Sequence, residues 1–170
     1  METRFGAPVA GSEKDVLAGF LDHYRKILLE VCDGLPESEL RRPMVASGTS
    51  LLGIVKHLAY VERGWFQENV GNEPYDYPFD ADADPDADFR VEDNETAEDV
   101  FELYRRACER SRRALDDASL DAMITNPKRS RDYNVRWVVV HMIEETARHV
   151  GHADIMREQI DGKTETGYRS

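Results

Sequence analysis

The chain has few cysteines and no long apolar run, and each shortage excludes a class of protein. Only Cys32 and Cys108 occur among its 170 residues, with no Cys-x-x-Cys pair or Cys/His cluster, so a structural zinc knuckle is not expected. Both cysteines are expected to be small buried core residues. No stretch approaches the roughly 18 apolar residues of a membrane span, and the first residues lack an apolar signal-peptide segment. We therefore expect a cytoplasmic protein with no membrane association.

Basic residues are also scarce relative to acidic ones. Lys and Arg number 22 against 34 Asp and Glu, a formal charge of −12, which argues against nucleic acid or anionic lipid as a partner. The excess lies between Gly71 and Glu95, where ten acidic residues accompany Arg90 alone. A solvated acidic loop is the ordinary interpretation of such a stretch.

The length and the apolar content of 41% predict one domain over residues 1–170, with tails at 1–12 and 163–170. Alternating runs typical of strands are missing, whereas helical periodicity is strong, so an all-α fold is expected. The predicted helices cover about 13–32, 50–70, 97–115 and 134–160.

Start and stop signals bracket these segments. Ser12 and Thr96 are suited to cap the first and third helices, and glycines follow the first, second and last. Four amphipathic helices of this length predict a four-helix bundle. The acidic link between the second and third helices is the longest, and it is long enough to cross the bundle so that these two helices run parallel.

One face of the last predicted helix carries an unusual set of side chains. His141, Glu145, His149 and His152 recur at steps of 4, 4 and 3, and Val138 and Met156 share their face. That face is therefore expected to turn inward, where unpartnered imidazoles and carboxylates are costly. A metal ion would satisfy several of them together. Alternatively, they are surface residues or core groups with ordinary hydrogen bonds.

The spacing limits which residues could share one ion. His141 with Glu145, or Glu145 with His149, leaves the helix from one face a turn apart. His141 and His149 are roughly 12 Å apart along the axis and cannot both bind it. His57, on the second predicted helix, would supply a third ligand. Two imidazoles and a carboxylate suit zinc, iron(II) or nickel(II), with zinc expected first.

The segments VVVHMIEETARHVGHADIMRE and KHLAYVERGWF resemble the histidine-bearing helices of the DinB-like superfamily, in particular its mini-circle protein branch. The resemblance extends from about residue 13 to 162. It implies an up-down-down-up four-helix bundle in which a divalent metal lies between a histidine of the second helix and two residues, four apart, of the last helix. Members of this superfamily are often dimers, so a homodimer is an expectation too.

The resemblance also implies a ligand set. The usual pair on the last helix is two histidines followed by a glycine, and alignment on Gly151 places Glu145 and His149 in the pair. A glutamate thus replaces the commoner histidine, as in the related mycothiol-dependent maleylpyruvate isomerases. The implied metal ligands are His57, Glu145 and His149.

The resemblance further implies a chemistry. Several relatives are metal-dependent transferases of a low-molecular-weight thiol, mycothiol or bacillithiol, onto a small electrophile. His141 and His152 would be neighbours of the metal, as groups that contact its ligands or as acid/base residues. Trp65 and Trp137 would line the substrate pocket between the second and last helices, or would simply pack in the core. The alternatives are a metal-activated hydrolase, and a non-catalytic bundle whose metal sphere is closed by a fourth ligand such as His152.

Overall fold

The computed structural model describes residues 7–124 and 132–164, and these residues form an all-α fold with one minimal hairpin. In chain order the elements are α1 (Glu13–Cys32), α2 (Glu37–Arg41), α3 (Leu51–Glu62), the π-helical η1 (Arg63–Val70), the 3₁₀ turn η2 (Ala87–Phe89), α4 (Ala97–Asp117), β1 (Met123–Ile124), β2 (Tyr133–Asn134) and α5 (Val135–Asp161). The all-α prediction is confirmed.

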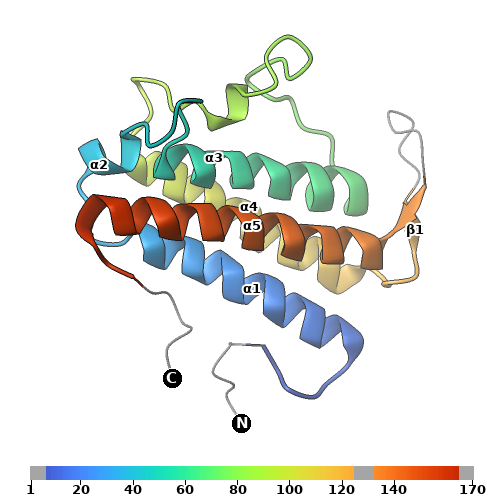
Figure 1. Cartoon of the computed structure of the whole chain (residues 1–170). Coiled ribbons are helices and arrows are strands. Elements are labelled where there is room, and N and C mark those ends of the chain that lie inside the picture. The colour runs from blue at the N-terminus through green and yellow to red at the C-terminus, as the bar shows by residue number, and fades with distance from the viewer. Residues whose placement is uncertain (1–6, 125–131, 165–170) are drawn as a thin grey trace.

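The long helices pack lengthwise, with α1 and α5 running one way and α3 and α4 the other (Figure 1). Arg136 at the start of α5 pairs with Glu13 at the start of α1, with Nε and Oε1 2.8 Å apart, so these helices begin at the same end. Lys14 of α1 instead donates to the Ala118 carbonyl just beyond α4, at 2.9 Å. Each helix therefore has both parallel and antiparallel neighbours, and the long acidic link makes the parallel α3–α4 arrangement feasible.

The ends of the helices agree with the predicted start and stop signals. Ser12 and Thr96 each accept a hydrogen bond from the amide three residues ahead, at 3.2 Å in both cases. Asn134 does the same for α5 at 2.9 Å. These side chains satisfy first-turn amides that lack a partner within the helix. α5 ends at Gly162, whose φ of 75° lies in the left-handed region that glycine adopts without strain.

The second predicted helix has the expected extent but two geometries. α3 is a regular α-helix, and η1 continues it with a wider turn, in which the Gly71 amide donates to the Phe66 carbonyl at 2.7 Å. That five-residue spacing is typical of a π-helix. The side-chain amide of Asn69 donates to the Gly64 carbonyl. A side chain that takes a carbonyl from the α-helical ladder is a known cause of such a local change.

Apolar side chains fill the interior in two clusters, one around Leu58 and Tyr104 and one around Phe66 and Met142. Cys32 and Cys108 are buried and free, which confirms their expected place in the core. No helix within the described ranges combines the length and apolarity needed to cross a bilayer.

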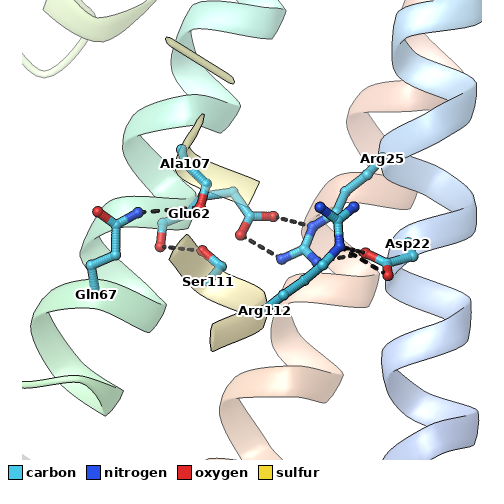
Figure 2. A network of polar contacts seen from close by, with 7 residues as sticks. All are labelled: Asp22, Arg25, Glu62, Gln67, Ala107, Ser111 and Arg112. Carbon is cyan, nitrogen blue, oxygen red and sulfur yellow. Dashed lines mark hydrogen bonds and ion pairs between the residues drawn. The ribbon is translucent and has the colours of Figure 1, made fainter. Parts of the chain in front are cut away.

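A polar network, buried at Arg25 and Glu62 and exposed at its other end, connects α1, α3 and α4 (Figure 2). Arg25 donates through Nε and Nη2 to the two carboxylate oxygens of Glu62, at 2.7 and 2.6 Å. Asp22 accepts from Arg25 at 2.8 Å and from Arg112 of α4 at 2.9 Å. A buried ion pair is tolerated when its geometry is bidentate and its remaining atoms have partners. The network therefore fixes how these helices meet.

The acidic link returns over α3 (Figure 1), and its second half is anchored there. A Cβ atom on Gly53 would lie 2.5 Å from the Phe89 carbonyl oxygen, so only glycine permits this close approach. The buried Lys56 donates to the Arg90 carbonyl and to the Glu95 carboxylate, both at 2.6 Å. This half of the link is thus packed against the bundle, which a wholly solvated loop would not be.

The sequence does not predict three smaller features. α2 occupies the first interhelical link, and the hairpin pairs Met123 with Asn134 just before α5. Part of the expected N-terminal tail packs on α1, because Ala7 is buried and a Cβ atom on Gly19 would be 2.6 Å from Pro8. The rest of the expected tails includes residues 1–6 and 165–170, which lie outside the described part of the chain.

Candidate metal centre

Three of the side chains singled out in the sequence meet between α3 and α5. His57 Nε2 lies 3.5 Å from Glu145 Oε1, and His149 Nε2 lies 3.2 Å from the same oxygen. One ligand atom from each residue falls within 4.8 Å of the others. Glu145 and His149 are one turn apart on α5, while His57 comes from α3, so only the packing of these two helices completes the set.

The set is partly covered by protein. The side chains of His57, Glu145 and His149 are 14%, 21% and 13% exposed. The inward face of α5 is mainly apolar, with Thr146 and Arg157 as its buried polar residues, and the histidine stripe runs along its flank. The prediction that the whole stripe turns inward is therefore only partly right. The three side chains are therefore mostly covered, and each keeps a small exposed fraction.

Electrostatics favour the protonation states that metal ligands need. Burial is the largest influence on Glu145 and by itself would raise the pKa of its carboxyl group. The charges and hydrogen bonds of His149 and His57 together outweigh burial, and the net pKa is lowered. Burial, followed by repulsion from His57, lowers the pKa of His149. Ionised carboxylate and neutral imidazole are the forms that bind a cation.

Asp88 and Phe89, from the acidic link, contact His57 on the side of the ring away from Glu145 and on its face, respectively. His57 Nδ1 lies 2.8 Å from Asp88 Oδ2, and the Phe89 ring stacks on the imidazole with centroids 3.9 Å apart and planes at 12°. If Nδ1–H donates to this carboxylate, Nε2 is left with the free lone pair that a metal requires. Nothing in the sequence singles out Asp88, because it is one of ten acids in a stretch that looks uniformly solvated.

The donor set fits a divalent metal. Two imidazole nitrogens and one carboxylate oxygen match the ligands of zinc sites that keep a position open for water or substrate. Within the described residues, the buried Nδ1 of His149 and Oδ1 of Asp88 have no hydrogen-bond partner. Leaving buried polar atoms unpaired is costly. Such unpaired atoms are common around functional centres.

His141 and His152 both lie outside this cluster. His141 stacks on Trp137, with centroids 5.1 Å apart, and meets the edge of Trp65 at 4.6 Å. His152 is exposed, and its ring centroid lies 5.6 Å from that of His149. The candidate ligands among the described residues therefore number three, and His152 does not join them.

A pocket of about 390 Å³ opens beside His149. It is bordered by the segment between α2 and α3, by Phe89 and by the last turns of α5. Trp65 and Trp137 do not line it. They pack with Tyr133 and His141 in an aromatic cluster near the start of α5. A role of the tryptophans in lining a substrate pocket therefore stays a prediction.

The fold and the cluster define a DinB-like helical bundle with a candidate metal centre between its second and last long helices. The chain belongs to the mycothiol S-transferase family, whose model matches residues 16–162. The family resemblance inferred from the two histidine-bearing helices is confirmed.

The fold is also similar to that of a solved structure. A conserved protein from Enterococcus faecalis superposes with a TM-score of 0.64 over 91% of this chain and 100% of its own, at 13% sequence identity. At that identity the likeness shows the fold alone. None of the curated proteins compared with the chain matches it.

Proposed function

We propose that this protein is a metal-dependent thiol S-transferase that joins mycothiol, or the related bacillithiol, to a small electrophile. One observation carries the proposal: in a member of the mycothiol S-transferase family, His57 Nε2, Glu145 Oε1 and His149 Nε2 converge on one point, and each side chain keeps a small exposed fraction. These three side chains would hold a divalent cation, zinc in the first instance and nickel(II) or iron(II) otherwise. A bound cation would supply the positive charge that lowers the pKa of a thiol from about 8.5 toward neutrality.

The other roles in the reaction, namely orientation of a ligand, charge balance and proton transfer, are assigned to side chains of the protein. Asp88 orients His57, and Glu145 supplies the negative charge that balances part of the cation. His152 lies at the edge of the adjacent pocket, within reach of solvent, and is the better placed of the two flanking histidines to accept the thiol proton and release it to water. His141 is held among tryptophan rings and has no comparable access to that pocket.

Two alternatives differ in what the centre does. A metal-activated hydrolase would use the same three ligands and need no thiol. In a non-catalytic bundle, a fourth protein ligand would complete the coordination sphere of the metal. The cluster argues against that alternative, because no fourth His, Cys, Asp or Glu joins the three residues within the described part of the chain. A thiol requirement is therefore the decisive property.

The test has a metal part and a thiol part. Metal analysis of purified protein should find about one divalent ion per chain in the wild type, and His57→Ala should lose it, because removing one of three ligands weakens binding. His141→Ala removes a histidine from α5 outside the cluster and should keep the ion. The loaded protein is then incubated with monochlorobimane and mycothiol, bacillithiol, glutathione or cysteine.

Acceleration by mycothiol or bacillithiol, lost in His57→Ala, supports the proposal. Acceleration with no thiol preference, or none with any thiol, would overturn it. Ester or amide hydrolysis without a thiol would favour the hydrolase instead.

A further inference from the structure

The pocket beside His149 has a lining that differs from most of the molecular surface. The described residues that line it are Val45, Ser47, Thr49, Phe89, His149, His152, Ile155, Met156 and Gln159. None of them is Asp, Glu, Lys or Arg, although such residues make up 33% of the chain. Its volume of about 390 Å³ lies in the range of small-molecule sites.

Besides His149 and His152, the polar side chains in this lining are uncharged. Ser47 and Thr49 place their hydroxyl oxygens 3.1 Å apart, and Gln159 adds an amide. Val45, Phe89, Ile155 and Met156 supply apolar contact. A charged ligand would lose hydration here and would meet no Asp, Glu, Lys or Arg in the lining, whereas an apolar body with one neutral polar group would be accommodated.

The pocket adjoins the candidate metal centre through two shared side chains. His149 belongs to both, and Phe89 lines the pocket while stacking on His57. A molecule bound in it therefore lies next to the place where the thiol would be held. The sugar-based thiols are strongly hydrophilic, so the apolar lining fits the other substrate better.

We propose that this pocket binds the electrophilic co-substrate and selects an uncharged molecule with an apolar body of about the size of a substituted benzyl group. The proposal rests on the proposed function and names the substrate class of the same site. For a benzyl chloride, the thiol sulfur forms a bond to the benzylic carbon while the carbon–chlorine bond breaks. Chloride leaves with the bonding electron pair, and the thiol proton passes through His152 to water.

Binding is tested first, without turnover. The protein freed of metal, in which no cation can bind the carboxylate, is titrated with 4-nitrobenzyl alcohol, which is neutral, and with 4-(hydroxymethyl)benzoate, which is anionic. Methyl resonances of Ile155 and Met156 are followed by NMR. The neutral ligand should bind at least about 10-fold more tightly, because burying an unpaired carboxylate is unfavourable. Equal affinity, or shifts that avoid these two residues, would overturn the proposal.

Two matched variants locate the effect. Ile155→Glu places a carboxylate at the pocket, and Val140→Glu makes the same change on α5 outside the pocket. The side chains of Ile155 and Val140 are 57% and 50% exposed, so neither substitution should disturb the core. We expect Ile155→Glu to weaken neutral-ligand binding about 10-fold or more, and Val140→Glu to leave it unchanged. Equal effects of the two variants would contradict the assignment.

Turnover separates this inference from the proposed function. With mycothiol, the rate with 4-nitrobenzyl chloride should exceed that with 4-(chloromethyl)benzoate, and Ile155→Glu should reduce it. Selective binding without any thiol conjugation would overturn the proposed function and leave the pocket assignment standing. Conjugation with no preference between the two chlorides, and with no effect of Ile155→Glu, would overturn the pocket assignment alone.

Discussion

The geometry of the candidate centre depends on a residue that is not itself a ligand. Asp88 contacts the far nitrogen of His57, at 2.8 Å, and no other described residue accepts a hydrogen bond from that ring atom. A metal-binding histidine usually donates its other N–H to such a partner, which sets its tautomer and orientation. Asp88 should therefore control how well Nε2 presents its lone pair.

Replacing Asp88 should weaken metal binding without unfolding the protein. Asp88→Ala removes the acceptor and should lower zinc affinity about 10- to 100-fold, the range typical of such partners. Asp88→Asn keeps an acceptor oxygen and should have a smaller effect. Competition with a chelating dye measures both affinities. Asp86→Asn, which removes a nearby exposed carboxylate, is the control, and an equal loss there would show that only bulk charge matters.

At the scale of the elements, the contact between η2 and α3 brings Asp88 to His57. Gly53 permits this contact because its missing side chain leaves room for the Phe89 carbonyl. Lys56 then holds the following residues through the Arg90 carbonyl. Gly151, beside the ligand pair on α5, has no such reason to be glycine, since a Cβ atom there would meet nothing within 4 Å.

The two helical glycines should respond in opposite directions to substitution by alanine. Gly151→Ala should raise the free energy of unfolding by up to about 1 kcal/mol, because alanine is the better helix former. Gly53→Ala should lower it by roughly 1–3 kcal/mol, since η2 must move away from α3. Denaturant titration of both variants measures these changes. A stabilising Gly53→Ala would show that the link does not pack as described.

Gly53→Ala should also weaken zinc binding, as Asp88→Ala does, because both separate Asp88 from His57. Zinc affinity unchanged in Gly53→Ala would mean that the link adjusts without loss of the Asp88 contact.

At the scale of the whole molecule, charged side chains help to set how the helices meet. Asp22 of α1 accepts hydrogen bonds from Arg25 of α1 and Arg112 of α4, and Arg25 continues the network to Glu62 of α3. Burial is the largest influence on Asp22 and opposes ionisation. The two guanidinium groups outweigh it, and the net pKa of Asp22 is lowered below its usual 3.8.

This network predicts how acid affects stability. A carboxyl group with a lower pKa in the folded state stabilises the fold above its unfolded pKa, and that contribution disappears as the pH falls through the folded pKa. Wild type should therefore be more stable than Asp22→Asn at neutral pH, and the difference should shrink below about pH 4. Thermal unfolding at several pH values measures it.

Asp116→Asn is the control for this prediction, because it removes an exposed carboxylate without removing a contact to Arg25 or Arg112. A difference between wild type and Asp22→Asn that does not change down to pH 2 would contradict the prediction. The homodimer and the cytoplasmic location expected from the sequence stay predictions at this scale.

The sequence predicted the parts of the site that are local. Glu145 and His149 are one turn apart on a helix whose start at Asn134 and end at Gly162 are both marked in the sequence. Caps, periodicity and ligand spacing depend on residues within a few positions of each other, so a single chain carries these signals in full. The spacing also allowed His141 with Glu145, and the family resemblance favoured the pair of Glu145 and His149.

Only the tertiary structure decided which distant groups meet. His57 and Glu145 are 88 positions apart, and no local pattern encodes the contact of Asp88 with His57 or the neutral pocket beside His149. The same packing keeps His141 among the tryptophans and leaves His152 at the surface. The physical reason is that long-range contacts follow from the packing of whole helices and of the link across α3. That packing depends on close contacts such as the one between Gly53 and the Phe89 carbonyl oxygen, and not on periodicity.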